Sequence, residues 1–279
     1  FNFAMAEQSQ LPKFTSHNHD TKNSEIDKPI APYDYLQQYL DRQLQIRGTT
    51  RKNLRVLDVG CGRGDTVAWL CEQGWDAYGV DIVEDYLERG RRYLHQTGWD
   101  PERLMLVNPD LSYPIADEHF DIVISDQTFE HVADLGATAA EIARVSSPRA
   151  TGLHIYPAKW RPVETHLFTP LAHWLPKGPL RRAAIATCLR LRLAAPYFEQ
   201  HVISDRVEIF TQFSHEETFY RPLAETTAVL EACGMKCDTR RGSIDLMALR
   251  LPRLPQPTRP MLGWLYRHFF SVVIHTVKQ

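Results

Sequence analysis

The stretch RVLDVGCGRGDTVAWL, residues 55–70, decides the fold of this chain. It starts with an apolar run, continues through glycines at three alternate positions, Gly60, Gly62 and Gly64, and ends with apolar residues at helical spacing. This order predicts a strand, a tight turn and a helix. Glycine accepts positive φ and carries no Cβ to obstruct a ligand, and the helix that follows offers free amide hydrogens. We therefore expect a ligand to approach the backbone at this turn.

Short apolar runs and helical patterns continue to alternate through residue 156. Parallel strands joined by helical crossovers produce this pattern. The predicted fold class is α/β, with a doubly wound, seven-stranded, mostly parallel sheet and an antiparallel edge hairpin formed by residues 235–241 and 244–251. The predicted parallel strands are residues 55–59, 76–80, 104–108, 120–125 and 151–156, and the helices between them are residues 65–73, 83–96 and 135–145.

Three segments depart from this regular core, which we place at residues 31–250. Residues 1–30 are mostly polar and aperiodic, so we expect a mobile N-terminal arm. Residues from about 157 to 213 hold several prolines around one helical stretch, which indicates a lid inserted after the fifth strand. Residues 251–279 are predicted to form a proline-rich linker and an aromatic-rich C-terminal helix.

Composition and charge narrow the class of protein and its partners. Hydrophobic residues make up 43% and charged residues 24%, as in an ordinary soluble globular protein. The formal net charge of −2 provides no attractive field for a nucleic acid, so no nucleic-acid partner is expected. The five cysteines are few and odd in number, which favours reduced thiols in a cytoplasmic setting. Cys233 and Cys237 lack a second pair or a histidine cluster, so no metal site is expected.

The two ends of the chain set the expectations about membranes. Residues 1–30 lack the apolar core of a secretory signal. The apolar stretch from Met261 is interrupted by Arg267, His268 and His275, so no transmembrane segment is expected. Packing of the C-terminal helix on the core is the main prediction. Peripheral contact of this helix with a membrane and pairing with another subunit are the alternatives.

Asp58, on the strand before the glycines, indicates the charge of the ligand. A nicotinamide or flavin dinucleotide would bring a diphosphate, which a carboxylate repels, whereas a cationic nucleoside thioether would be attracted. The spacing G-x-G-x-G also differs from the G-x-G-x-x-G spacing of dinucleotide folds. We therefore expect a ligand that carries a cation.

With these residues in view, the sequence resembles the class I methyltransferases that bind S-adenosylmethionine. VLDVGCGRG, residues 56–64, is similar to their first motif, and YGVDIVEDYLERGRR, residues 78–92, to their second. VNPDLSYPIADEHFDIVISDQTFEHV, residues 107–132, continues the likeness through the next two strands. The resemblance covers roughly residues 54–156, with weaker support at 214–250. It implies a methyltransferase domain at residues 31–250 with S-adenosyl-L-methionine as the cofactor.

The resemblance implies roles for individual residues of the cofactor site. Asp81, at the end of the second strand, would hold both ribose hydroxyls, because an ionised carboxylate accepts two hydrogen bonds. Asp110, after the third strand, would accept a hydrogen bond from the adenine amino group. The predicted cofactor-binding residues are Asp58, Gly60, Cys61, Gly62, Gly64, Asp81, Ile82, Asp110, Leu111, Asp126 and Gln127. Structural alternatives stay open: Asp58 caps the loop, Asp81 caps the next helix, and Asp110 is an acid in a solvated turn.

Methyl transfer from a sulfonium is an in-line displacement, so alignment of the reactants is the enzyme's main task. A hydroxyl acceptor benefits from a general base, and histidine is the natural candidate near neutral pH. VETHLFTPLAHWLPKGPLRR, residues 163–182, resembles a subset of the family with lipid-like, glycan or secondary-metabolite acceptors. The predicted catalytic residues are His166, as first choice of base, His131 and Glu164, and the predicted substrate-binding residues are Trp160, His173 and Trp174.

Structural alternatives apply to these residues as well. His166 and Glu164 would then brace the lid, His131 would organise the loop after the fourth strand, and the tryptophans would belong to the lid's own core. The lid is also locally basic, which a solvated helix face explains most simply. An anionic acceptor or an acidic carrier protein is the alternative. The basic residues concerned are Lys177, Arg181, Arg182, Arg190 and Arg192.

The predicted function is S-adenosylmethionine-dependent methyl transfer to a small-molecule, lipid-like or glycan acceptor, with oxygen as the preferred acceptor atom. N- or C-methylation is an alternative within the same fold. A non-catalytic S-adenosylmethionine-binding protein and a nicotinamide-dependent oxidoreductase are alternatives from other classes. Binding of S-adenosylhomocysteine, measured as a rise in melting temperature, separates the last of these from the rest.

Overall fold

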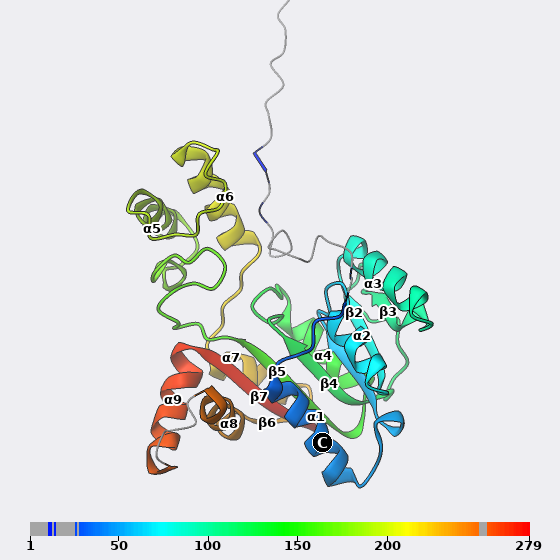
Figure 1. Cartoon of the computed structure of the whole chain (residues 1–279). Coiled ribbons are helices and arrows are strands. Elements are labelled where there is room, and N and C mark those ends of the chain that lie inside the picture. Colours follow the sequence, from blue (N-terminus) through cyan, green and yellow to red (C-terminus); the bar gives the residue numbers. More distant parts are fainter. Residues whose placement is uncertain (1–10, 13, 15–25, 27, 251–255) are drawn as a thin grey trace, which may run out of the picture. The chain divides into compact units, whose positions relative to one another are not determined.

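The computed structural model describes residues 11–12, 14, 26, 28–250 and 256–279. The chain divides into two compact units. The sheet unit comprises residues 20–162 and 219–279, and the helical unit comprises residues 163–218 together with N-terminal residues through 19. Figure 1 shows the sheet with its flanking helices and labels the elements of both units.

The sheet unit contains a seven-stranded sheet in the order β3-β2-β1-β4-β5-β7-β6. Strands β1 to β5 are parallel to one another, whereas β7 is antiparallel to both β5 and β6. The predicted α/β fold class, with a mostly parallel sheet and an antiparallel edge, is therefore confirmed. The strands are β1 (Arg55–Val59), β2 (Asp76–Asp81), β3 (Leu104–Leu106), β4 (Phe120–Asp126), β5 (Ser146–Pro157), β6 (Met235–Asp238) and β7 (Ser271–Lys278).

Helices cover both faces of this sheet (Figure 1). The neighbouring residues Val56 and Leu57 of β1 belong to two different hydrophobic clusters, because successive side chains of a strand point to opposite faces. A buried parallel sheet requires such cover on each side. The helices of the sheet unit are α1 (Asp34–Arg47), α2 (Asp65–Glu72), α3 (Glu84–Gln96), α4 (Leu135–Val145), α7 (Leu223–Ala232), α8 (Arg240–Arg250) and α9 (Arg259–Phe269).

The last part of the sheet unit corrects the sequence prediction. Residues 244–251 were expected to be the second strand of the edge hairpin, but residues up to 250 lie in helix α8. The strand that pairs with β6 is β7, within the segment predicted to be only a linker and a helix. A short apolar run fits a strand or a buried helix equally well. Residues 271–278, SVVIHTVK, are rich in β-branched residues, which favour a strand.

The helical unit has its own small hydrophobic core. It contains α5 (Pro179–Arg190), α6 (Ile203–Glu216) and a short 3-10 helix, η4 (Ala172–Trp174). Leu167, Ile185, Phe210 and Phe213 are almost fully buried in this core. This unit overlaps the segment predicted to be a lid, and its role as a lid stays a prediction.

Most of the arm predicted at residues 1–30 lies outside the described residues. Among its described members, Phe14 is buried in the core of the helical unit, where its ring packs against Phe213 at a centroid distance of 4.7 Å. Phe14 thus contacts the helical unit, and the mobility of the arm stays a prediction. Ile26 is also buried.

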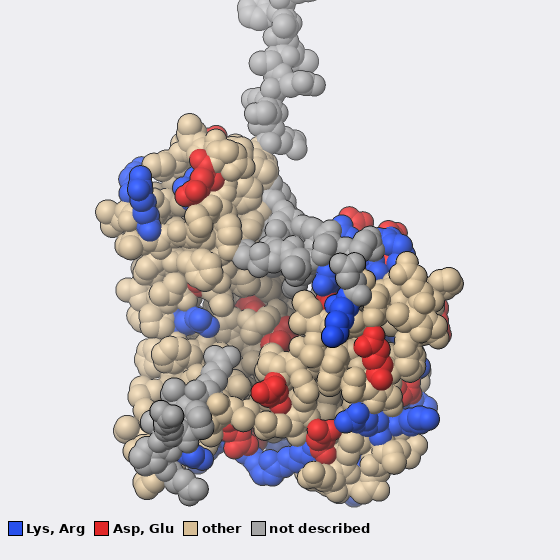
Figure 2. All heavy atoms as spheres, viewed as in Figure 1, with Lys and Arg blue, Asp and Glu red and all other residues tan. Residues whose placement is uncertain are grey.

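Among the described residues, no helix combines the length and hydropathy that a membrane crossing requires. Acidic and basic side chains are mixed on the face of the sheet unit that Figure 2 shows.

Candidate functional site

The loop after β1 leaves its backbone open at one position. Gly62 has φ +57°, and a Cβ built on it would meet no other atom within 4 Å. The loop is tied to the neighbouring strand, since the amides of Gly60 and Cys61 both donate to the carbonyl oxygen of Val80 at 2.8 and 3.1 Å. Gly62 is therefore held in place with open space where a Cβ would lie, and its contact with a ligand stays a prediction.

Asp81 joins this loop to the start of α3. It is buried at the end of β2, where its Oδ2 accepts the amide hydrogen of Gly62 at 2.7 Å and its Oδ1 accepts that of Val83 at 3.0 Å. Each carboxylate oxygen has a second lone pair, so these bonds leave capacity for ribose hydroxyls. Asp81 thus accepts the amide hydrogen of Val83, the residue just before α3, and keeps the capacity to bind a ligand. The next residue, Ile82, exposes 67% of its surface at this edge.

The loop lies in a negative electrostatic environment. Asp58 is buried on β1, between Gly79 of β2 and Ile124 of β4 in the strand register. The pKa of the Cys61 thiol is raised well above its usual range, first by burial and then by the carboxylates of Asp81 and Asp58. The carboxylates, which disfavour a thiolate here, favour a cation, whereas burial disfavours any charge. The expected preference for a cationic ligand is consistent with this environment.

The loops after β1 and β4 meet where the strand order reverses. The Thr128 hydroxyl donates to the carbonyl oxygen of Val59 at 3.0 Å, and the Gln127 amide donates to that of Ile155 at 2.8 Å. Asp126, at the end of β4, accepts a hydrogen bond from the Tyr33 hydroxyl at 2.9 Å. Ligands of open α/β sheets bind at such a switch point, beside the carboxyl ends of the strands.

Asp110 and Leu111 form a separate turn after β3. The Oδ1 of Asp110 accepts hydrogen bonds from the Ser112 hydroxyl at 2.6 Å and from the Ser112 amide at 3.0 Å. These bonds lower the pKa of the fully exposed Asp110 carboxyl. Leu111 adopts φ +69° and is partly exposed. This geometry matches the solvated turn acid that the sequence left as an alternative, and an adenine contact by Asp110 stays a prediction.

Several residues that shape the loop escaped the sequence analysis. A Cβ on Gly90 of α3 would collide with the carbonyl oxygen of Arg63, and a Cβ on Gly79 of β2 would lie 2.6 Å from Cys61 Sγ. Both glycines let neighbouring elements pack against the loop. The signal for Gly90 was its place within a helical pattern, where an isolated glycine often has a packing reason. Tyr33, by contrast, gave no local signal.

The FEHV segment after β4, residues 129–132, is held by contacts with β5 and with Phe219. The Phe129 ring stacks on the ring of His154 of β5, with centroids 4.9 Å apart and planes inclined by 18°. Glu130 is almost fully buried, and its carbonyl oxygen accepts the amide hydrogen of Phe219 at 2.6 Å. His131 Nε2 lies 4.0 Å from Glu130 Oε1. These contacts fix the backbone that presents His131 at the carboxyl edge.

The candidate acceptor residues are divided between the two units. Trp160 belongs to the sheet unit, is 39% exposed and lies with its ring centroid 5.3 Å from the Lys159 ammonium. Glu164, His166, His173 and Trp174 belong to the helical unit.

Glu164 and His166 come together within a turn of the helical unit. Glu164 is buried, and its Oε2 accepts the amide hydrogens of His166 and Leu167. The His166 ring meets Phe213 edge-on at a centroid distance of 5.6 Å. The bracing role that the sequence left open for Glu164 agrees with these bonds. His173 is buried in η4, and its carbonyl oxygen accepts a hydrogen bond from Arg181 at 3.3 Å. Trp174, in the same 3-10 helix, is partly buried.

A family model described as a methyltransferase domain matches residues 57–152. Residues 57–152 thus match a methyltransferase domain. The match includes most of β1, the glycine loop, Asp81 and the loop after β4, where the predicted cofactor-binding residues lie. The family and fold predicted from the motifs are thereby confirmed.

Curated relatives of the methyltransferase domain have modest similarity. A protein named probable tocopherol O-methyltransferase, chloroplastic, from Oryza sativa subsp. japonica is 33% identical over 101 residues, which is 36% of this chain and 28% of that protein. Ubiquinone biosynthesis O-methyltransferase from Methylococcus capsulatus is 26% identical over 144 residues, or 51% of this chain and 58% of that protein. The chain thus spans less than two thirds of the length of either relative.

Solved structures of similar fold include an S-adenosylmethionine dependent methyltransferase from Mesorhizobium loti. Its identity with this chain is 16%, with coverage of 85% of this chain and 96% of that chain and a TM-score of 0.49. The family assignment rests on the sequence match.

A matched pair of glycine substitutions tests the ligand edge of the methyltransferase domain. Gly62 and Gly74 both have positive φ and open space at the Cβ position. Gly74 lies between α2 and the start of β2, at the amino end of that strand, whereas Gly62 lies at the carboxyl edge of the sheet. Replacing either with alanine is expected to lower the free energy of unfolding by about 1–2 kcal/mol. Only Gly62→Ala is expected to weaken S-adenosylhomocysteine binding, by at least about tenfold, because its Cβ occupies ligand space. Urea unfolding and calorimetric titration measure the two effects, and equal affinities would remove Gly62 from the site.

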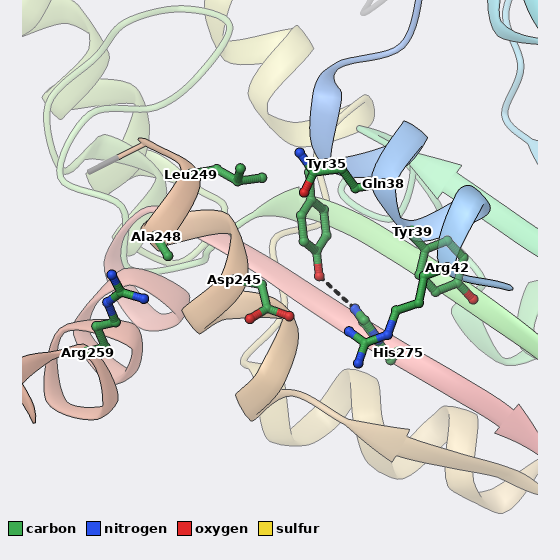
Figure 3. A pocket seen from close by; sticks show the side chains of 9 residues that line it. All are labelled: Tyr35, Gln38, Tyr39, Arg42, Asp245, Ala248, Leu249, Arg259 and His275. Atoms are coloured by element: carbon green, nitrogen blue, oxygen red, sulfur yellow. Dashed lines mark hydrogen bonds between the residues drawn. The ribbon is translucent and has the colours of Figure 1, made fainter. Parts of the chain in front are cut away.

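The sheet unit also has a pocket of about 380 Å³ away from these residues (Figure 3). The Tyr35 hydroxyl of α1 and His275 Nε2 of β7 point toward each other across it, 2.8 Å apart. His275 pairs with Leu153 in the middle of the sheet, so the pocket does not belong to the carboxyl edge. The lining residues include none of the predicted site residues: Tyr35, Gln38, Tyr39, Arg42, Asp245, Ala248, Leu249, Arg259 and His275.

Proposed function

We propose that this chain transfers the methyl group of S-adenosylmethionine to a hydroxyl of a small, lipid-like acceptor. The observation that carries the proposal is the bare backbone at Gly62 beside the buried carboxylate of Asp81, within a segment that matches a methyltransferase domain. A positive φ without a Cβ, a nearby acceptor of hydroxyl hydrogens and a negative field together suit a cationic nucleoside.

The donor would be held by residues at the carboxyl ends of β1 to β4. In this proposal Asp81 accepts hydrogen bonds from the ribose hydroxyls and the exposed Ile82 packs against the adenine. Asp110 accepts from the adenine amino group, and Asp58 contributes negative potential toward the sulfonium. When bound, S-adenosylmethionine supplies an activated methyl group.

The protein's part in the reaction is to align the acceptor and to take up its proton. The methyl carbon forms a bond to the acceptor oxygen as its bond to sulfur breaks, and the hydroxyl proton passes to a general base. His166 is the base that we propose first, with His131 as the alternative. Glu164 orients the backbone that carries His166.

The names of the relatives support the choice of acceptor. Tocopherol and ubiquinone O-methyltransferase denote transfer to oxygen on lipid-like molecules. In the proposal, Trp160, Trp174 and His173 contact the acceptor, since aromatic side chains offer large apolar surfaces with polar edges.

Product analysis tests the reaction. Purified protein with methyl-deuterated S-adenosylmethionine is expected to transfer label to a prenylated phenol, and the labelled group should be located on oxygen by mass spectrometry. Matched acceptors with an amine or with a blocked hydroxyl are expected to remain unlabelled. Binding of S-adenosylhomocysteine without turnover on any acceptor would favour the non-catalytic alternative. Stabilisation by a nicotinamide cofactor alone would contradict the proposal.

The identity of the general base is tested by replacing each of the two candidate histidines with glutamine. His166→Gln is expected to lower kcat by about 100-fold or more and to remove the acidic limb of the pH profile. His131→Gln is expected to retain that limb. His95→Gln, at an exposed position of α3, is the control for loss of a histidine. The reverse result for the first two variants would assign the base to His131, and a retained limb in both would exclude histidine.

A further inference from the structure

Helix α9 turns an apolar stripe toward solvent. Met261, Trp264 and Leu265 are 63%, 47% and 37% exposed, and their spacing places them on one face of the helix. Large apolar side chains gathered on an exposed helix face mark an interaction site more often than isolated ones do.

The orientation of α9 is fixed by its inner face. Gly263 and Tyr266 are buried, and a Cβ on Gly263 would lie 2.7 Å from Ile244 of α8. The close approach of α8 and α9 therefore depends on glycine at this position. Because the inner face is packed, the exposure of Trp264 is a property of the folded sheet unit. Figure 1 shows α8 and α9 beside β7.

The C-terminal end of α9 reaches the carboxyl edge of the sheet. The carbonyl oxygen of Phe270 accepts the amide hydrogen of Ala158 at 3.1 Å, just after Pro157 of β5 pairs with Ser271 of β7. Phe270 is 49% exposed, and Trp160 follows Ala158 by two residues. The exposed aromatic residues thus continue from α9 to the chain that leaves β5.

The charge of these segments has one sign. Residues 158–161 read AKWR and residues 259–270 read RPMLGWLYRHFF, with four arginines or lysines, one histidine and no aspartate or glutamate. The whole chain, by contrast, has a formal net charge of −2. Tryptophan and phenylalanine combined with basic residues are typical of helices that lie in a membrane interface.

We propose that α9 and residues 158–161 form a docking surface for an anionic lipid bilayer. The exposed aromatic and aliphatic side chains enter the headgroup region, while Lys159, Arg161 and Arg267 meet the negative surface potential. Arg259 is not part of this face, because it lines the pocket beside Tyr35. Charge complementarity favours this occupant over a second copy of the chain, since two copies of the surface would oppose like charges. The docking surface goes beyond the proposed methyl transfer, and its binding requires no catalysis.

Vesicle sedimentation tests the docking surface directly. The full chain is expected to sediment with vesicles of phosphatidylcholine and phosphatidylserine, weakly with phosphatidylcholine alone, and less at high salt. Trp264→Ser combined with Leu265→Ser is expected to weaken the binding by at least about tenfold. The matched control is Leu191→Ser with Leu193→Ser, two exposed leucines of the helical unit, which should bind as the unaltered chain does.

Further measurements keep the result unambiguous. Circular dichroism checks that the variants fold, and Met261→Ser with Lys159→Gln gives a second, independent disruption of the docking surface. Equal sedimentation of variant and unaltered chain would overturn the proposal, as would no sedimentation of either. A dimer in light scattering that Trp264→Ser dissolves, without vesicle binding, would assign the stripe to a second copy. Methyl transfer in detergent-free buffer is measured separately, so failure of docking and failure of catalysis are distinguishable.

Discussion

Replacing Asp81 with alanine is expected to abolish measurable binding of S-adenosylhomocysteine. Two hydrogen bonds to a charged group contribute about 1.5–3 kcal/mol each, so their loss weakens Kd by at least about 100-fold. The substitution also releases the amides of Gly62 and Val83, which loosens the loop itself. At a ligand concentration about 100-fold above Kd, the unaltered chain should gain about 2.7 kcal/mol of stability, and the variant should gain at most about 0.4 kcal/mol.

Two further variants separate binding from folding in this experiment. Asp81→Asn retains one oxygen acceptor, and its affinity for S-adenosylhomocysteine is expected to lie between that of Asp81→Ala and that of the unaltered chain. Asp85→Ala removes an exposed carboxylate from the first turn of the same helix, α3, and is expected to bind normally. Thermal unfolding without ligand measures the structural cost by itself. An undiminished ligand response in Asp81→Ala would exclude Asp81 from the ribose site.

The second large effect is expected at His154, whose burial makes stability depend on pH. His154 is fully buried, with Nδ1 2.9 Å from the Ser125 hydroxyl, and burial, together with His275, lowers its pKa to about 3. Below about pH 6.5 the unfolded chain binds a proton at this residue that the folded chain does not. The free energy of unfolding should therefore fall with decreasing pH, by about 1.4 kcal/mol per unit from this residue, until the pH approaches its folded pKa.

The measurement is urea unfolding at a series of pH values, with His154→Gln for comparison. The variant is expected to be less stable at neutral pH and to lose less stability on acidification. Burial also lowers the pKa of His119 and His215, but these residues stay in both proteins and cancel in the comparison. His95→Gln controls for removal of an exposed histidine. Parallel pH profiles for His154→Gln and the unaltered chain would show that His154 does not titrate as its burial requires.

The parallel half of the sheet could be predicted because its signals are local. Each strand from β1 to β5 is a short apolar run bounded by turn residues, and each neighbour follows from right-handed crossovers. The edge could not be predicted in the same way. The apolar residues of α8 and β7 fit either structure as isolated segments, and packing against α9 and β5 decides between them.

The candidate site shows the same division between local and distant information. The glycine loop and Asp81 could be predicted from the sequence because the residues that form the turn and those expected to bind the ligand lie in short, recognisable motifs. Tyr33 reaches Asp126 across 93 positions, and Thr128 reaches Val59 across 69. No pattern within either segment encodes such a meeting. The bracing contacts of Glu164 were predicted only as an alternative. A buried carboxylate can accept hydrogen bonds from backbone amides or take part in proton transfer, and the local sequence does not distinguish these two roles.

The position of β7 between β5 and β6 affects how the chain acquires its structure during synthesis. Strand β6 is synthesised more than thirty residues before β7, which is the only described strand that pairs with it. Until residue 278 leaves the ribosome, β5 has a bare edge and β6 has no ladder to join. Nascent chains that stall in this interval would expose an apolar strand edge, which is a site for aggregation and chaperone capture.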